Sequence, residues 1–160
     1  MSTESIHSPA VITSEALREH FQGHRRLTRR VIEAFPEDRF LTFSLGGMRP
    51  FGEMVAELLA MATPLFEGIV SGEWGEYAPP DVRSREDALR LWDEATARID
   101  ELWPHIPFDR FEEPMTAFGT YTAPVRGLIQ YALDNEIHHR GQGYVYLRAL
   151  GIEPPPFWER

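Results

Sequence analysis

The segment from Thr122 to Leu150 is the most clearly bounded helix-forming stretch of this chain. Pro124 falls within its first turn, where the missing N–H of proline has no helical partner to lose. Gly151 can adopt the left-handed conformation that ends a helix, and Pro154 to Pro156 prevent the helix from continuing. The sequence therefore predicts a long final helix from about Thr122 to Leu150.

Three more helices are predicted upstream, because apolar residues recur there with the helical period. They span Ser14 to Phe35, about Pro50 to about Val70, and Ser84 to Trp103, and Pro64 should bend the second. The linker from Ser71 to Arg83 can extend along a helix roughly 30 Å long. We therefore expect an all-α four-helix bundle with one long crossover, formed by residues 14–160 as a single domain after a flexible tail at residues 1–13.

Composition excludes several kinds of chemistry. The 160 residues include no cysteine and no lysine, so all 16 basic side chains are arginine. This excludes a thiolate nucleophile, a zinc–cysteine or iron–sulfur site, disulfide bonds and Schiff-base chemistry. The net charge of -9 disfavours a nucleic-acid partner, because such binding requires neutralisation of phosphates.

No segment of the sequence predicts export or membrane insertion. Residues 1–13 lack the basic start and apolar run of a secretory signal. The most apolar stretch, Met54 to Met61, contains Glu57 and is much shorter than the roughly 20 residues of a membrane span. We expect a cytoplasmic protein without a membrane partner.

The strongest local signal is a polar cluster at residues 134–142, in the middle of the final helix. Residues four apart share a helix face, so Asn135 lies over His139. The helical stripe that contains both would place Asn135, His139 and Gln142 inside the bundle. Buried imidazole and amide groups require partners, because each unpaired buried polar group costs roughly 1 to 3 kcal/mol.

Glu57 is the expected partner of these residues. It lies on the stripe Met54, Glu57, Met61 and Leu65, which the second helix should turn to the core. A buried carboxylate has to be paired or bind a cation, and we therefore expect Glu57 and His139 to meet. The spacing leaves three alternatives open: a satisfied core network, a Glu57 at the wet end of its helix, or a metal site.

Other features predict packing more than chemistry. The segment from Pro104 to Tyr121 is long and aromatic, so it should pack against the bundle and partly cover the site as a cover or a lid. Gly141 and Gly143 lie within the final helix, where close approach of a neighbouring helix or space for a ligand would explain them. His105 is expected to be a loop residue without a role.

The first helix carries two groups of polar residues. His20 and His24 are four apart, a spacing that can bind a metal, but a solvated His20 beside a partly buried His24 is the simpler expectation. The arginine pairs could bind an acidic cofactor or a dimer partner; we expect a solvated face that pairs with nearby acids. These pairs are Arg25, Arg26, Arg29 and Arg30.

The chain resembles the DinB-like, YfiT-type superfamily of small four-helix proteins. The resemblance is most specific at residues 138–142, 146–148 and 151–155, and weaker at residues 35–38 and 48–53. It implies metal-dependent proteins with three histidine ligands, many of them dimers, and several that act as thiol transferases or related hydrolases and isomerases. Position by position, the three ligands fall on Glu57, Asn135 and His139.

This ligand set has one imidazole where the family pattern has three. Glutamate is a competent oxygen ligand, but the neutral carbonyl of asparagine is a poor one for zinc. The resemblance therefore implies a divalent-metal site for zinc, nickel or manganese at Glu57, Asn135 and His139, in which binding is weak or absent.

Two functions follow from the residues and the resemblance together. The first is a metal-dependent thiol (S-)transferase or hydrolase that forms a homodimer and acts on a small-molecule substrate such as a low-molecular-weight thiol. The alternative is a non-enzymatic stress-response or ligand-binding bundle whose metal site has degenerated into a structural polar network.

Overall fold

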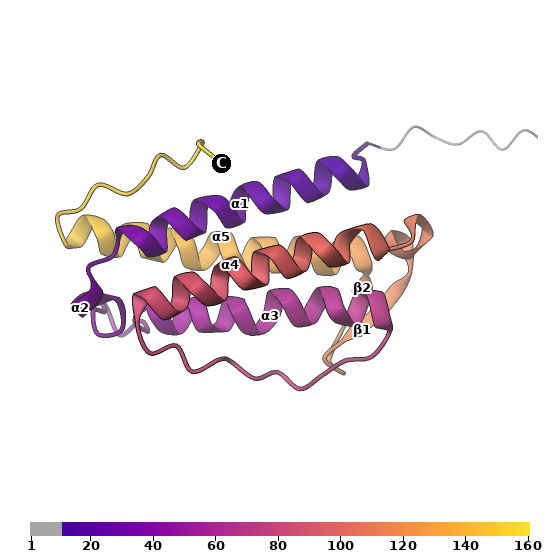
Figure 1. Ribbon diagram of the computed structural model, residues 1–160, viewed down its shortest axis with the longest axis horizontal. Coiled ribbons are helices and arrows are strands. Elements are labelled where there is room, and N and C mark those ends of the chain that lie inside the picture. Colours follow the sequence, from indigo (N-terminus) through magenta and orange to yellow (C-terminus); the bar gives the residue numbers. More distant parts are fainter. Residues whose placement is uncertain (1–10) are drawn as a thin grey trace, which may run out of the picture.

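The computed structural model describes residues 11–160, and within them four long helices form a bundle (Figure 1). They are α1 (Ser14–Ala34), α3 (Phe51–Ser71), α4 (Arg85–Leu102) and α5 (Val125–Ala149). Shorter elements connect them: α2 (Glu37–Phe40), the 3-10 turns η1 (Trp103–His105) and η2 (Phe108–Glu112), and the strands β1 (Pro114–Ala117) and β2 (Tyr121–Pro124). The expected flexible tail falls mostly on residues 1–10, which lie outside the described residues.

The long crossover follows α3. In Figure 1, α3 and α4 run in one direction while α1 and α5 run in the other, and residues 72–84 return along the side of the bundle to the start of α4. Each helix packs against two neighbours, so that α3 and α1 both contact α4 and α5. The prediction of an all-α four-helix bundle with one long crossover is confirmed.

Local chemistry explains most of the helix ends. The side-chain oxygen of Thr13 accepts a hydrogen bond from the backbone N–H of Ala16, and that of Ser84 accepts one from Asp87, so both α1 and α4 have side-chain N-caps. Gly72 closes α3 with φ of 79°, in the left-handed region that glycine tolerates best.

The final helix begins later than the sequence predicts. Residues 121–124 form β2, which pairs antiparallel with β1, and α5 starts at Val125 with Pro124 as its N-cap. Phe118 and Gly119 make the turn between the strands with positive φ. The predicted start at Thr122 is wrong because pairing with residues 114–117 holds these residues extended, and helical periodicity carries no information on that pairing.

Two apolar clusters fill the bundle. Near the hairpin, Phe21, Phe66 and Trp103 pack together with the ends of α3 and α5. At the opposite end, Phe35 and Phe51 stack with ring centroids 4.6 Å apart.

The close approach expected at Gly143 is confirmed. A Cβ atom there would lie 2.6 Å from Cε2 of Phe51, so α3 and α5 can meet only at a glycine. Gly141 has nothing within 4 Å of such an atom, and packing does not explain it.

The apolar character of α3 reflects its place in the bundle. Over Phe51–Ser71 the helix is long and apolar enough to cross a membrane. The stretch from Met54 to Met61, on which the sequence-based expectation rests, is only part of this apolar helix. The apolar window is 61% buried by the other elements, as expected for a core helix.

Candidate functional site

Glu57 on α3 and His139 on α5 face each other, as the sequence predicts. Nε2 of His139 lies 3.1 Å from Oε1 of Glu57, and Nδ2 of Asn135 lies 3.5 Å from the same oxygen. The stripes of the two helices therefore bring the three predicted residues together. The predicted place of Gln142 inside the bundle is wrong. Its side chain is half-buried, and its Nε2 lies 2.8 Å from Nε2 of the exposed His138.

Arg49 completes this group from outside the helix. Its Nη2 donates a hydrogen bond to Oε2 of Glu57 across 2.5 Å, while its backbone carbonyl accepts one from the hydroxyl of Tyr146. Burial raises the pKa of the Glu57 carboxyl, but the hydrogen bonds from Arg49 and His139 outweigh it and hold that pKa below its ordinary value. Glu57 is therefore ionised at neutral pH, and each of its oxygens already has a partner.

His139 is neutral at neutral pH. Burial lowers the pKa of its imidazole, and the neighbouring Glu57 opposes this shift without reversing it. Because Glu57 is ionised, Nε2 of His139 is the nitrogen that carries the proton and donates to Oε1. The other nitrogen, Nδ1, is buried and has no hydrogen-bond partner among the described residues.

A pocket of about 740 Å³ opens beside Glu57, between α3, α5 and the β1–β2 hairpin. Apolar side chains make up most of its wall, and three tyrosines with half-exposed rings and two threonines contribute the remaining hydroxyl groups. The apolar residues include Met61, Leu65, Ala117, Phe118 and Leu128, and the tyrosines are Tyr77, Tyr121 and Tyr131. Its size is that of a site for a small organic ligand.

The hairpin forms part of the expected cover. Within the segment 104–121, Phe111, Met115 and Phe118 pack against the core, and Ala117 and Phe118 form one wall of the pocket. Phe108 is exposed instead of packed. The segment therefore partly covers the site as predicted, with a two-stranded hairpin where a loop was expected.

The donor set does not fit the three-imidazole metal site that the resemblance implies. Among residues 11–160, no three histidine, aspartate or glutamate side chains lie close enough together to share an ion. A metal on Nε2 of His139 would move the proton to Nδ1, which then needs an acceptor such as a carbonyl or carboxylate, and none is near it. Arg49 already supplies a cation to Glu57. The arrangement is that of a hydrogen-bonded polar network.

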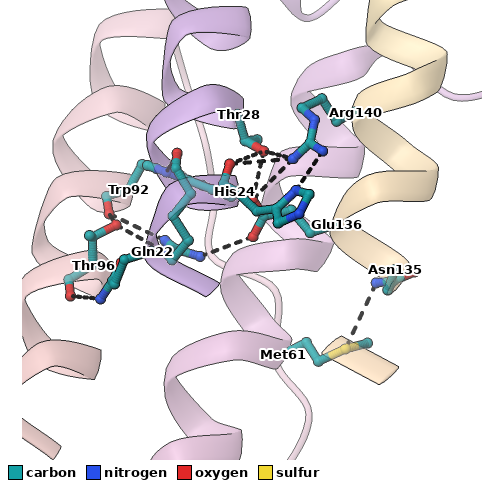
Figure 2. A network of polar contacts seen from close by, with 10 residues as sticks. Gln22, His24, Thr28, Met61, Trp92, Thr96, Asn135, Glu136 and Arg140 are labelled. Carbon is teal, nitrogen blue, oxygen red and sulfur yellow. Dashed lines mark hydrogen bonds and ion pairs between the residues drawn. The ribbon is translucent and has the colours of Figure 1, made fainter. Parts of the chain in front are cut away.

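A second polar network lies deeper, between α1, α4 and α5 (Figure 2). Glu136 is 2% exposed and accepts a hydrogen bond of 2.6 Å from Thr28, with guanidinium nitrogens of Arg25 and Arg140 each 3.6 Å from its oxygens. The Arg25 guanidinium also lies over the ring of Trp92, 3.8 Å from the centroid. In Figure 2, Asn135 points away from this network toward Met61.

The burial of Arg25 contradicts the solvated face that the sequence predicts for the arginine pairs. Arg25 lies four residues after Phe21 and so continues the apolar stripe of α1, the one signal in the sequence that could have revealed it. Burial lowers the pKa of Arg25 to about 10, against the opposing charge of Glu136. Burial also raises the pKa of Glu136, and the nearby arginines limit that rise.

The other three arginines pair with acids on the surface, as expected. Their partners are Glu19 for Arg26, Asp93 for Arg29 and Glu159 for Arg30. His105 is an exposed residue at the end of η1.

His24 is buried, with 5% of its surface exposed, whereas the sequence predicts partial burial. Its Nδ1 lies 2.8 Å from Nη2 of Arg140 and its Nε2 lies 3.0 Å from Nη1 of Arg160. Burial and these two cations lower the pKa of His24 to about 3. The exposed His20 contacts the ring of His24 edge-on, with centroids 4.7 Å apart, so the pair has no shared metal-binding face.

Fold and site together define a four-helix bundle in which a hydrogen-bonded carboxylate lines a mainly apolar pocket. The model of the DinB family matches residues 1–160, and the chain belongs to that family.

The chain is also similar to Bacillus proteins whose names state no activity. The uncharacterized protein YjoA of Bacillus subtilis strain 168 is 27% identical over 153 residues, which cover 92% of this chain and 97% of YjoA. The crystal structure of the DinB-like YjoA from Bacillus subtilis superposes with a TM-score of 0.72 at 21% identity and covers 90% of this chain and 98% of its own. The crystal structure of a DinB-like protein from Bacillus cereus ATCC 10987 superposes with a TM-score of 0.76 at 14% identity. This match covers 90% of this chain and 97% of that protein.

Proposed function

We propose that this member of the DinB family is a ligand-binding bundle that takes a small organic molecule into the pocket beside Glu57. The observation that carries the proposal is that a fixed carboxylate lines a mainly apolar pocket. The pocket is about 740 Å³ in volume with a mainly apolar wall, and Glu57, which lines it, is held in place by Arg49 and His139. A few fixed polar groups at one end of an apolar cavity are typical of small-molecule sites.

In this proposal Asn135 and His139 are positioning residues. They hold one oxygen of the Glu57 carboxylate while Arg49 holds the other, so that the charge stays at a defined place. A bound molecule would contact Glu57 and the apolar walls, and the hairpin would exclude water from it.

Two glycines of α5 provide a matched test. A Cβ atom at Gly127, which lines the pocket, would make only ordinary contacts of 3.7 and 3.9 Å, and one at Gly141 would meet nothing within 4 Å. Gly127→Leu should therefore fill the pocket while Gly141→Leu leaves it open. In a screen of small organic fragments followed by protein-observed nuclear magnetic resonance, hits on the wild type should move signals of Met61, Leu65 and Leu128.

The screen has one decisive comparison. Hits should persist in Gly141→Leu and disappear in Gly127→Leu. Fragments that bind both variants equally well, or that shift signals only away from the pocket, would contradict the proposal.

A second candidate is a metal-dependent transferase or hydrolase that uses a low-molecular-weight thiol. Its one supporting observation is that the three residues meet: Nδ2 of Asn135 and Nε2 of His139 lie within 3.5 Å of Oε1 of Glu57. Metal analysis of protein purified without an affinity tag tests it, because stoichiometric zinc, nickel or manganese would support it. A homodimer and a cytoplasmic location stay predictions of the sequence.

A further inference from the structure

The described part of the pocket wall carries a negative charge. Of the described residues that line it, Glu57 alone carries a charge, and no basic side chain lines it. Met61 and Leu65 follow Glu57 along α3 and line the same pocket. An anionic molecule would meet a carboxylate there, whereas a positively charged one would find a partner in a surrounding of low polarity.

Aromatic rings surround the same space. Tyr77, Tyr121, Tyr131 and Phe118 line the pocket, and the rings of Tyr121 and Tyr131 stack with centroids 6.0 Å apart. Aromatic faces attract ammonium groups through their quadrupoles, and a carboxylate among aromatic rings is a common way to bind organic cations.

Arg49 reaches Glu57 from outside this pocket. It lines a separate, smaller hollow with Gly52, Pro79 and Val82. The Arg49 side chain is 48% exposed, whereas that of Glu57 is 21% exposed. The guanidinium can therefore move into water when a cation from the pocket takes its place on Glu57, and this exchange replaces one charge-assisted contact by another.

We propose that the ligand is an organic cation, an amine with an aromatic or branched apolar body, whose ammonium group binds Glu57 in place of Arg49. The inference rests on the ligand-binding function proposed above and names the ligand class. Arg49 then acts as a built-in competitor that neutralises Glu57 while the pocket holds no ligand.

Three probes of nearly equal shape separate the possibilities: 4-phenylbutylamine, 4-phenyl-1-butanol and 4-phenylbutyrate. Titration calorimetry at pH 7 should show the amine binding about tenfold or more tightly than the alcohol, and the carboxylate binding most weakly. Equal affinities, or a preference for the carboxylate, would overturn the inference and leave the ligand-binding function standing. If none of the probes binds and the fragment screen also finds no ligand, both fail.

Two variants test the roles of the charges. Glu57→Gln should remove the preference for the amine, while Glu53→Gln, an exposed position one turn earlier on α3, should leave it unchanged. Arg49→Gln should strengthen amine binding several-fold, because the competing cation is gone. Weaker amine binding in Arg49→Gln would contradict the assigned role, and this result can be obtained even if Glu57→Gln does not fold.

Discussion

The guanidinium of Arg49 and the carboxylate of Glu57 form an ion pair of 2.5 Å beside the pocket between α3, α5 and the hairpin. Arg49 precedes α3 and Glu57 lies two turns into it, so the pair ties the start of the helix to its own inner face. A cation from the chain thus occupies the carboxylate that the family pattern would assign to a metal.

Asn135→His should raise the affinity for zinc or nickel, and the wild type should bind both weakly. A histidine at position 135 adds an imidazole one turn from His139 on the same face, where both can reach a shared ion. Calorimetric titration with zinc, nickel and manganese measures the change, and Gln130→His, on an exposed position of α5, is the control. Tight zinc binding by the wild type would show that the assessment of the donor set is wrong.

Arg25→Met should lower the free energy of unfolding by about 3 kcal/mol, because it leaves the buried Glu136 with less compensation. Arg26→Met, on the next residue, removes only an exposed ion pair with Glu19 and should cost less than about 1 kcal/mol. Urea denaturation followed by circular dichroism gives both values. Equal losses in the two variants would mean that the buried network contributes nothing specific.

Two glycine-to-alanine substitutions on α5 should change the free energy of unfolding in opposite directions. Gly143→Ala places a methyl group 2.6 Å from the ring of Phe51 and should destabilise the fold by about 1 to 3 kcal/mol. Gly141→Ala meets nothing and should stabilise it by about 0.5 to 1 kcal/mol through helix propensity. Thermal unfolding of both variants decides; a neutral Gly143→Ala would show that α3 and α5 can separate at no cost.

His24 should make the fold sensitive to acid. Its folded-state pKa of about 3 lies below the ordinary value of 6.5, so the unfolded chain binds the extra proton first. The stability contribution is complete above pH 6.5 and is lost as the pH falls from 6.5 toward 3. Glu136, whose pKa is raised, acts in the opposite direction, but it is present in parent and variant alike.

The variant His24→Gln isolates this contribution. The difference in unfolding free energy between parent and variant should change in favour of the variant as the pH falls from 7 to 4. His20→Gln removes only the smallest of the effects that lower the His24 pKa, so it should depart from the parent much less than His24→Gln. A pH-independent difference for His24→Gln would contradict the low pKa.

The sequence predicts the parts of this structure that depend on local chemistry. Pro36, Gly72 and Ser84 mark helix ends through their own backbone and side chains, and the stripes of α3 and α5 place Glu57 opposite His139. These features need only the helical period and the residue types.

Features that depend on distant partners could not be predicted in the same way. The start of α5 depends on pairing between β1 and β2, and the burial of Arg25 depends on Glu136, which lies more than a hundred residues away. Arg49 precedes its helix, so no stripe relates it to Glu57. Charged residues on an apolar stripe can be placed only once their partners are known.

The most direct test of the ligand-binding account is a titration of the chelator-treated, metal-free protein with 4-phenylbutylamine. Ligand recognition by Glu57 and the aromatic wall needs no metal, so the account predicts saturable binding at one site with the same affinity before and after metal removal. Binding that is lost on chelation and restored by zinc would contradict it and favour the metal-dependent function instead.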